Sequence, residues 1–179
     1  GPAGGPGTDV DVAVARYKPN GALDPTFGGG DGRVTTDFGG AVDVPHAMAL
    51  TGGGKLAVVG LRQPVSLDQE FMAVRYRSDG ELDPTFGDDG IVRTNFTPGD
   101  DVAWDVAIQP DGRIVAVGGA GFGQRGFLVA RYRRDGTLDP TFGDGGRVVT
   151  RYRDANARAV VVQPDGRIVV AGYNSRGLA

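Results

Sequence analysis

One six-residue motif occurs three times in this chain of 179 residues. The motif Leu-Asp-Pro-Thr-Phe-Gly begins at Leu23, Leu82 and Leu138, so consecutive copies start 59 and 56 residues apart. Self-similarity at such a period is typical of proteins in which one small unit of secondary structure is stacked or arranged around an axis. The chain is therefore constrained to a repeated unit of that length.

The unit that spans residues 100–152 shows the pattern of its strands most clearly. Large apolar side chains occupy every second position from Val102 to Ile108, with the period of two that is typical of a strand with one buried face. The sequence Gln-Pro-Asp-Gly at 109–112 then predicts a tight turn into a short β-branched strand. The four strands predicted for the unit are residues 101–108, 113–118, 127–132 and 146–152.

Four short antiparallel strands in a repeat of this length are typical of the blade of a β-propeller. The 32 glycines of the chain, without a collagen period, indicate many tight turns between short elements. No segment keeps the apolar period of a helix over a useful length, which argues against a helical repeat. The predicted fold class is all-β: a β-propeller made of four-stranded antiparallel blades, with about three blades per chain.

The other copies of the unit contain the same motifs. Gln-Pro-Asp-Gly-Arg-Ile occurs at 109–114 and 163–168, and Ala-Arg-Tyr or Val-Arg-Tyr ends a strand at Tyr17, Tyr76 and Tyr132. Together with the Leu-Asp-Pro-Thr-Phe-Gly loop, these motifs resemble the delta-60 repeat family, bacterial β-propeller repeats of largely unassigned function. The resemblance implies a secreted or cell-surface bacterial protein. The family has no catalytic motif that could be assigned to residues of this chain.

The repeat begins and ends in the middle of a blade. Residues 11–17 carry the signature of a third strand, whereas the last strand, 167–172, carries that of a second strand. Residues 1–8 are rich in glycine and proline, as in the remnant of a cleaved expression tag, and we expect them to form a flexible N-terminal segment. The predicted units are a half-blade at 9–40, a blade at 41–98, a blade at 99–153 and a half-blade at 154–179.

A terminal half-blade exposes a row of unpaired backbone N–H and C=O groups, which favours pairing with another chain. Three blades are also too few to close, since propellers typically contain four to eight. We expect two copies of the chain to form a homodimer with a closed six-bladed ring, in which each shared blade takes two strands from each copy. Two alternatives stay open: the chain is an excerpt of a longer natural propeller, or it was excised or engineered to study assembly.

The first strand of each blade lines the central channel of a propeller, and three unlike residues occupy one position there. Alignment on the Gln-Pro-Asp-Gly turns places His46, Trp104 and Arg158 in one column, while neighbouring positions stay aliphatic. Such a variable position is suited to a ligand site, for a small polar or anionic ligand or a polymer at the mouth of the channel. Arg158 would donate hydrogen bonds and Trp104 would offer a stacking face. The structural alternative is a core Trp104, a packed or solvated His46, and an Arg158 whose charged end extends to water.

Two classes of function are compatible with this column. The first is a non-catalytic module that self-assembles and offers a binding or scaffold surface. The second is an extracellular lyase or hydrolase in which His46 is the base, Asp105 its partner and Arg158 an anion clamp. The first class is favoured, with no catalytic residue assigned, because the chain has one histidine, no cysteine and no Gly-x-Ser-x-Gly motif.

Composition argues against several kinds of partner. The net charge of -3 and the lack of a basic tract argue against nucleic acid, and no apolar run reaches the ~20 residues that span a membrane. No cofactor is expected, because one histidine without cysteine makes a structural zinc site improbable. Calcium is a minor alternative at the acidic loops near Asp31, Asp88 and Asp144, where tight turns account for the same Asp-Gly pairs.

Charged residues that recur in every copy are expected to have a structural role. An arginine precedes the tyrosine at the end of each third strand, and we expect it to form an ion pair with the aspartate of the Leu-Asp-Pro-Thr-Phe-Gly loop. The expected pairs are Arg16 with Asp24, Arg75 with Asp83, and Arg131 with Asp139. The aspartates are also expected to accept hydrogen bonds from backbone N–H groups two or three residues on. The loop phenylalanines are expected to pack between blades, at Phe27, Phe86 and Phe142.

Overall fold

A computed structural model of the chain describes residues 10–38, 42–64, 68–120, 126–152 and 155–174. The segment predicted at residues 1–8 lies outside these ranges. The described strands are β1 (Val12–Ala15), β2 (Arg33–Thr36), β3 (Val42–Leu50), β4 (Leu56–Gln63), β5 (Glu70–Tyr76), β6 (Ile91–Thr94), β7 (Asp101–Ile108), β8 (Ile114–Ala120), β9 (Phe127–Tyr132), β10 (Arg147–Thr150), β11 (Ala155–Val162) and β12 (Ile168–Asn174). Two short 3-10 turns, η1 (Gly28–Gly30) and η2 (Gly52–Gly54), lie between strands. No helix in the described ranges has the length and apolar character needed to cross a bilayer.

The strands form four antiparallel sheets. Two sheets have four strands, in the orders β3-β4-β5-β6 and β7-β8-β9-β10, and two have only two strands, β1-β2 and β11-β12. The four strands predicted between residues 101 and 152 are confirmed as β7 to β10, with ends that differ by at most two residues. The sheets are therefore consistent with propeller blades, whole in the middle of the chain and halved at each end.

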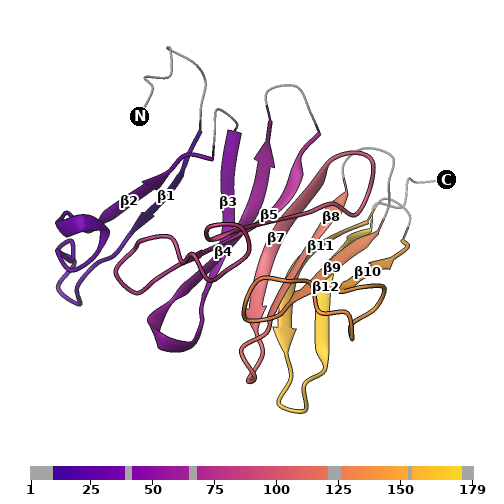
Figure 1. The fold of residues 1–179 in the computed structure, drawn as a ribbon. Coiled ribbons are helices and arrows are strands. Elements are labelled where there is room, and N and C mark those ends of the chain that lie inside the picture. Colours follow the sequence, from indigo (N-terminus) through magenta and orange to yellow (C-terminus); the bar gives the residue numbers. More distant parts are fainter. Residues whose placement is uncertain (1–9, 39–41, 65–67, 121–125, 153–154, 175–179) are drawn as a thin grey trace.

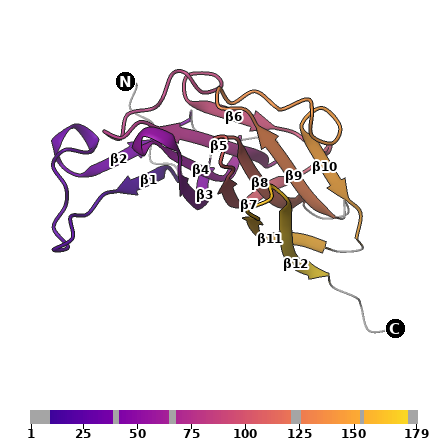
Figure 2. The ribbon, with the colours of Figure 1, turned by 90° about the horizontal axis from the view of Figure 1, so that it is seen from below.

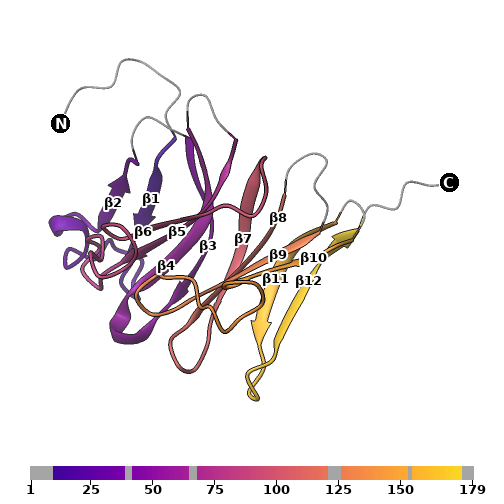
Figure 3. The ribbon, with the colours of Figure 1, turned by 45° about the vertical axis from the view of Figure 1, so that its right-hand side comes forward.

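The sheets stand side by side in the order of the sequence (Figure 1). The first strands β3, β7 and β11 lie next to one another along the inner side, and the second strand of one sheet lies against the first strand of the next. Seen from below, the four sheets follow an open arc with the half-sheet β1-β2 at one end and β11-β12 at the other (Figure 2). The two-stranded sheets β1-β2 and β11-β12 thus lie at opposite ends of the arc (Figure 3).

The hydrophobic core lies between neighbouring sheets. Phe86 is fully buried in a cluster that joins the two four-stranded sheets, and Phe27 is buried in a cluster that joins β1-β2 to the sheet that follows it. Phe142 is only partly buried against the cluster beside β11 and β12. The packing predicted for the loop phenylalanines is therefore confirmed. It is incomplete at Phe142, because the sheet beyond it has only two strands.

Each first strand contains a β-bulge, and a glycine of the second strand faces it. The strand pairing skips His46, Trp104 and Arg158 in β3, β7 and β11. A Cβ atom added to Gly118 would lie 1.8 Å from the carbonyl oxygen of Val102, and Gly60 faces the carbonyl of Val44 in the same way. The bulge brings the two backbones so close that a side chain has no room on the second strand.

Candidate functional site

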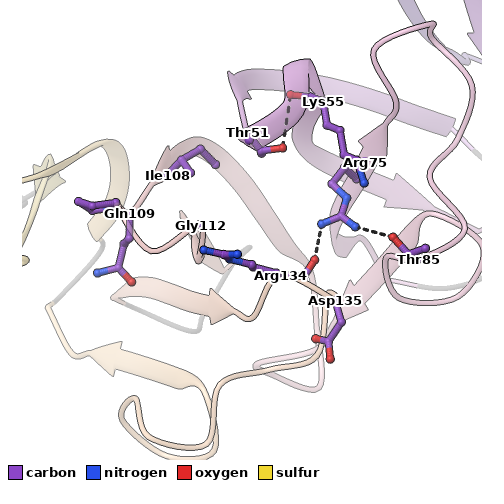
Figure 4. A pocket seen from close by; sticks show the side chains of 11 residues that line it. Thr51, Lys55, Arg75, Thr85, Ile108, Gln109, Gly112, Arg134 and Asp135 are labelled. Carbon is purple, nitrogen blue, oxygen red and sulfur yellow. Dashed lines mark hydrogen bonds between the residues drawn. The ribbon is translucent and has the colours of Figure 1, made fainter.

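The recurring arginine binds the loop of its own sheet, and in the first two copies it also reaches the sheet that follows. Nε of Arg75 lies 2.7 Å from Oδ2 of Asp83. Its Nη2 donates to the hydroxyl of Thr85 at 3.0 Å, and its Nη1 donates to the carbonyl of Arg134 in the next sheet (Figure 4). The guanidinium also lies 4.6 Å from the ring centre of Phe86, in a cation–π contact. The predicted ion pairs are confirmed in all three copies, at 2.9 Å for Arg16 with Asp24 and 3.0 Å for Arg131 with Asp139.

The loop aspartates also fix the turn that holds them. Oδ1 of Asp83 accepts the backbone N–H of Thr85 at 3.1 Å and its hydroxyl at 2.7 Å, and the other two copies make the same contacts. Burial alone would raise the pKa of Asp83, but hydrogen bonds from Lys55 and Thr85 and the charge of Arg75 outweigh it and lower this pKa. The hydrogen bond from Thr141, assisted by the charges of Arg131 and Arg113, lowers the pKa of Asp139 to about 2. The aspartates therefore stay ionised and keep their ion pairs with the arginines.

A cavity of about 600 Å³ lies at the joint between the two four-stranded sheets, on the side of the loops (Figure 4). Its charged lining includes Lys55, Arg75 and Arg134. Lys55 lies 2.7 Å from Asp83, and Nε of Arg134 donates to the carbonyl of Asp111 at 2.7 Å. Because these cations already have partners across or beside the joint, we interpret the cavity as a part of the inter-sheet joint.

The joint is complete in the middle of the arc and incomplete at its ends. The hydroxyls of Tyr76 and Tyr132 are bonded to threonines of the preceding sheet, Thr36 at 2.9 Å and Thr94 at 2.6 Å, and both tyrosines are fully buried. Tyr17 occupies the same position in the first half-sheet and is 63% exposed. The corresponding threonine at the other end, Thr150, is exposed as well.

A second contact follows the same rule. The residue at the start of each complete second strand binds the loop aspartate of its own sheet: Lys55 lies 2.7 Å from Asp83, and Arg113 lies 2.9 Å from Asp139. The third residue of this set, Arg167, has a side chain that is 78% exposed and pairs only with its neighbour Asp165 among the described residues. At each end of the arc, one partner of these contacts is therefore present without the other.

The column of unlike residues on the first strands forms one continuous stack. The rings of His46 and Trp104 are parallel within 21°, with 4.1 Å between their centres, and the Arg158 guanidinium lies 3.6 Å from the Trp104 ring centre. The indole N–H donates to Oδ1 of Asn156 at 3.3 Å, and Arg158 donates to the hydroxyl of Tyr173 at 3.4 Å. The bulges carry all three side chains to the same side of neighbouring strands, so the structure brings the predicted residues together.

Asp105 has a different environment from the one considered for an enzyme. Its Oδ1 accepts the N–H of Val106 at 2.9 Å, and its Oδ2 accepts the N–H of Val160 in the neighbouring strand β11 at 2.8 Å. His46 is bonded through Nδ1 to the carbonyl of Ala103 at 2.7 Å. That carbonyl can only accept, so Nδ1 carries a proton and Nε2 is the free position of the neutral ring.

The acidic loops are tight turns. The N–H of Asp88 donates to the carbonyl of Ile91 at 2.9 Å, and the N–H of Ile91 donates back to Asp88 at 3.1 Å; Asp144 and Arg147 repeat the arrangement. Oδ1 of Asp31 accepts the N–H of Arg33 at 2.8 Å. The predicted turn chemistry is confirmed at these positions.

Sequence comparison identifies the repeat. The profile of a family described as a beta-propeller domain of unknown function (DUF5122) matches residues 3–27, 54–86, 109–142 and 163–177. The chain belongs to this family. The two middle matches of the DUF5122 repeat end at Phe86 and Phe142, and the first ends at the corresponding Phe27. The last match begins at Gln163 as the third begins at Gln109, so the outer two matches cover complementary parts of one repeat. A comparison with curated proteins finds no match.

Proposed function

We propose that this chain is a non-catalytic β-propeller module of the delta-60 kind that completes its ring with a second copy of itself. The single observation that carries this proposal is the pair of complementary half-blades at the two ends of the arc. β1 pairs only with β2 and β12 only with β11 among the described residues, so each of these two strands leaves unpaired the edge that its counterpart in a four-stranded sheet uses. Free edges of this kind pair readily with another chain.

The complete sheets supply the register of the proposed contact. In them the second strand pairs with the third so that Leu56 lies opposite Tyr76 and Gly60 opposite Met72. The same register would place Ile168 of one copy opposite Tyr17 of the other, and Gly172 opposite Ala13. A groove of about 250 Å³ between β1 and β3, lined by Ala13, Ala15 and His46 among others, offers room for the incoming strand.

The incomplete contacts at the ends would then close in trans. Tyr17 of one copy would reach Thr150 of the other, as Tyr76 reaches Thr36 within the chain. Arg167 would reach Asp24 of the other copy, as Arg113 reaches Asp139. Two copies joined at both ends would make a closed ring of six blades with two-fold symmetry.

Sedimentation equilibrium tests the ring, and we expect a mass twice that of one chain. Tyr17→Ala should dissociate the dimer, because burial of a large aromatic side chain is worth about 3 kcal/mol. The loss occurs at both contacts of the ring, so the dissociation constant should rise roughly 10⁴-fold. Val149→Ala is the control, since Val149 is 46% exposed and its counterparts at the complete joints, Thr35 and Arg93, stay exposed there.

Each outcome separates the open alternatives. A wild-type chain that stays a well-folded monomer at high concentration would exclude the dimer and favour an excerpt of a longer propeller. A dimer that tolerates Tyr17→Ala as well as Val149→Ala would show that the two copies meet through a different surface.

We also propose that the stack of His46, Trp104 and Arg158 binds an anionic ligand at the mouth of the channel. The observation in its favour is the Arg158 guanidinium, which lies on the Trp104 ring but makes only one long hydrogen bond among the described residues, to Tyr173. Stacking holds the guanidinium plane in place and leaves most of its N–H groups for a carboxylate or phosphate. Asp105 is engaged by two backbone N–H groups, which favours binding over an acid–base reaction.

Trp104 is the one tryptophan of the chain, so its fluorescence reports on this stack directly. We expect saturable quenching on titration with citrate, inorganic phosphate or polygalacturonate. Arg158→Gln should abolish the response, whereas Arg93→Gln, which removes an equal charge from the exposed side of β6, should preserve it. Equal responses in the two variants would exclude a specific site. Any hydrolytic or lyase activity that is lost in His46→Ala would instead favour the enzymatic alternative.

A further inference from the structure

Three aspartates meet at the joint between the half-sheet β1-β2 and the sheet that begins with β3. Asp11 precedes β1, Asp37 follows β2, and Asp43 lies in β3. Each offers a carboxylate oxygen that lies within 4.8 Å of those of the other two. Three negative charges at this spacing repel one another, which requires a compensating positive charge or a proton.

Asp43 is the member of this cluster for which compensation matters most, because it is the most deeply buried of the three. Its side chain is fully buried, and Oδ2 accepts the N–H of Phe38 at 3.1 Å. Its Oδ1, although buried, has no hydrogen-bond partner among the described residues, and Oδ1 of Asp11 is in the same condition. A buried carboxylate oxygen without a partner is costly, and a cation that faces both oxygens would remove that cost.

The next joint along the arc serves as an internal control. There Asp101 occupies the position of Asp43, and it accepts the N–H of Phe96 at 2.7 Å and the hydroxyl of Thr97 at 3.0 Å. At the first joint the sequence position of Thr97 holds Gly39, which has no hydroxyl, and Asp37 stands in place of Asn95. The first joint has therefore exchanged an internal donor for an additional carboxylate.

The nearby arginine already has other partners. Arg62 lies opposite Asp43 in the pairing of β3 with β4, but its Nη1 donates to Glu70 and its Nη2 to the carbonyl of Phe38, both at 3.2 Å. Its Nε has no hydrogen-bond partner among the described residues, so a rotation of Asp43 towards Nε is the competing way to satisfy Oδ1. Burial raises the pKa of Asp43, and the charges of Asp11 and Asp37 add to that rise although Phe38 and Arg62 oppose it.

We propose that Asp11, Asp37 and Asp43 bind one divalent cation, calcium by preference, which fastens the half-sheet β1-β2 to its neighbour. Hard cations favour ligand sets made only of oxygen, and calcium accepts six to eight oxygens in flexible geometry, so water molecules can complete the shell. The site differs from the acidic loops near Asp31, Asp88 and Asp144, which form turns. It also does not require a closed ring, because all three ligands belong to one chain.

Calorimetric titration of the chelator-treated protein with calcium chloride tests the site. We expect one ion per chain with a dissociation constant on the order of 10⁻⁴ M, and a higher melting temperature in calcium. Asp37→Asn and Asp43→Asn should each weaken binding at least tenfold, and Asp37 is exposed, so its change should leave the fold intact. Asp101→Asn, the same change at the control joint, should leave the affinity unaltered.

Two results would overturn the proposal. The first is the absence of binding at about 10 mM calcium, which would indicate that Arg62 or a proton satisfies Asp43. The second is an affinity that Asp37→Asn and Asp43→Asn leave unchanged. Sedimentation of the same samples keeps this test apart from that of the ring, since a monomer that binds calcium contradicts the dimer alone.

Discussion

Arg75→Ala should lower the free energy of unfolding by about 3–5 kcal/mol, the usual cost of breaking a buried ion pair by removing one partner. Arg75 and Asp83 are almost entirely buried, at 8% and 2% side-chain exposure, so the substitution leaves a buried carboxylate with Lys55 as its remaining charged partner. It also removes the bond to the carbonyl of Arg134 in the next sheet. Urea unfolding at a fixed protein concentration measures the loss.

Arg16→Ala is the matched control, because Arg16 makes the same ion pair in the first half-sheet. Its side chain is 35% exposed and that of Asp24 is 20% exposed, so water can replace much of the lost interaction. We expect a cost of about 1 kcal/mol or less. Equal losses at Arg75 and Arg16 would contradict the view that burial at a complete joint makes this pair important.

Gly118→Ala should destabilise the chain by up to about 3 kcal/mol, the upper end of the usual cost of overpacking. The added methyl group would lie 1.8 Å from the carbonyl oxygen of Val102, and a backbone atom at a bulge cannot move aside as the end of a side chain can. Gly99→Ala is the same change at a position with nothing within 4 Å of the new Cβ, and it should alter stability by less than ~0.5 kcal/mol. Thermal unfolding of both variants checks the difference, and equal melting temperatures would refute the steric explanation.

The repeat made much of the fold predictable from the sequence. Alternating apolar residues in the sequence made strands such as β7 recognisable, although the bulge at Trp104 interrupts the alternation in the structure. The ion pair of Arg75 with Asp83 joins residues only eight positions apart that recur in three copies. Contacts between sheets were harder to foresee. Tyr132 and Thr94 are 38 residues apart, and although Tyr132 belongs to a recurring motif, nothing in the sequence pairs it with Thr94, so only the fold reveals that they meet.

The candidate sites also depend on contacts between sheets that the sequence alone did not predict. The alignment placed His46, Trp104 and Arg158 in one column, but the stacking of these side chains depends on β-bulges that the sequence analysis did not predict. The engagement of Asp105 with Val160 was not predicted either, because it depends on the approach of two strands. The aspartates at the first joint lie as far apart in the sequence as Asp11 and Asp43, and they attract notice only where their oxygens converge.

Because the same contact recurs at successive joints, the structure restricts how a gene of this kind can lengthen by duplication. The tyrosine–threonine contact between β5 and the preceding half-sheet is repeated between β9 and the sheet before it, so the same contact can form at any boundary between repeats. Duplication of one whole repeat would lengthen the arc and leave both free edges as they are. Duplication of half a repeat would give the chain two like edges that no longer match. Selection for matching ends would therefore restrict insertions and deletions to whole multiples of the unit.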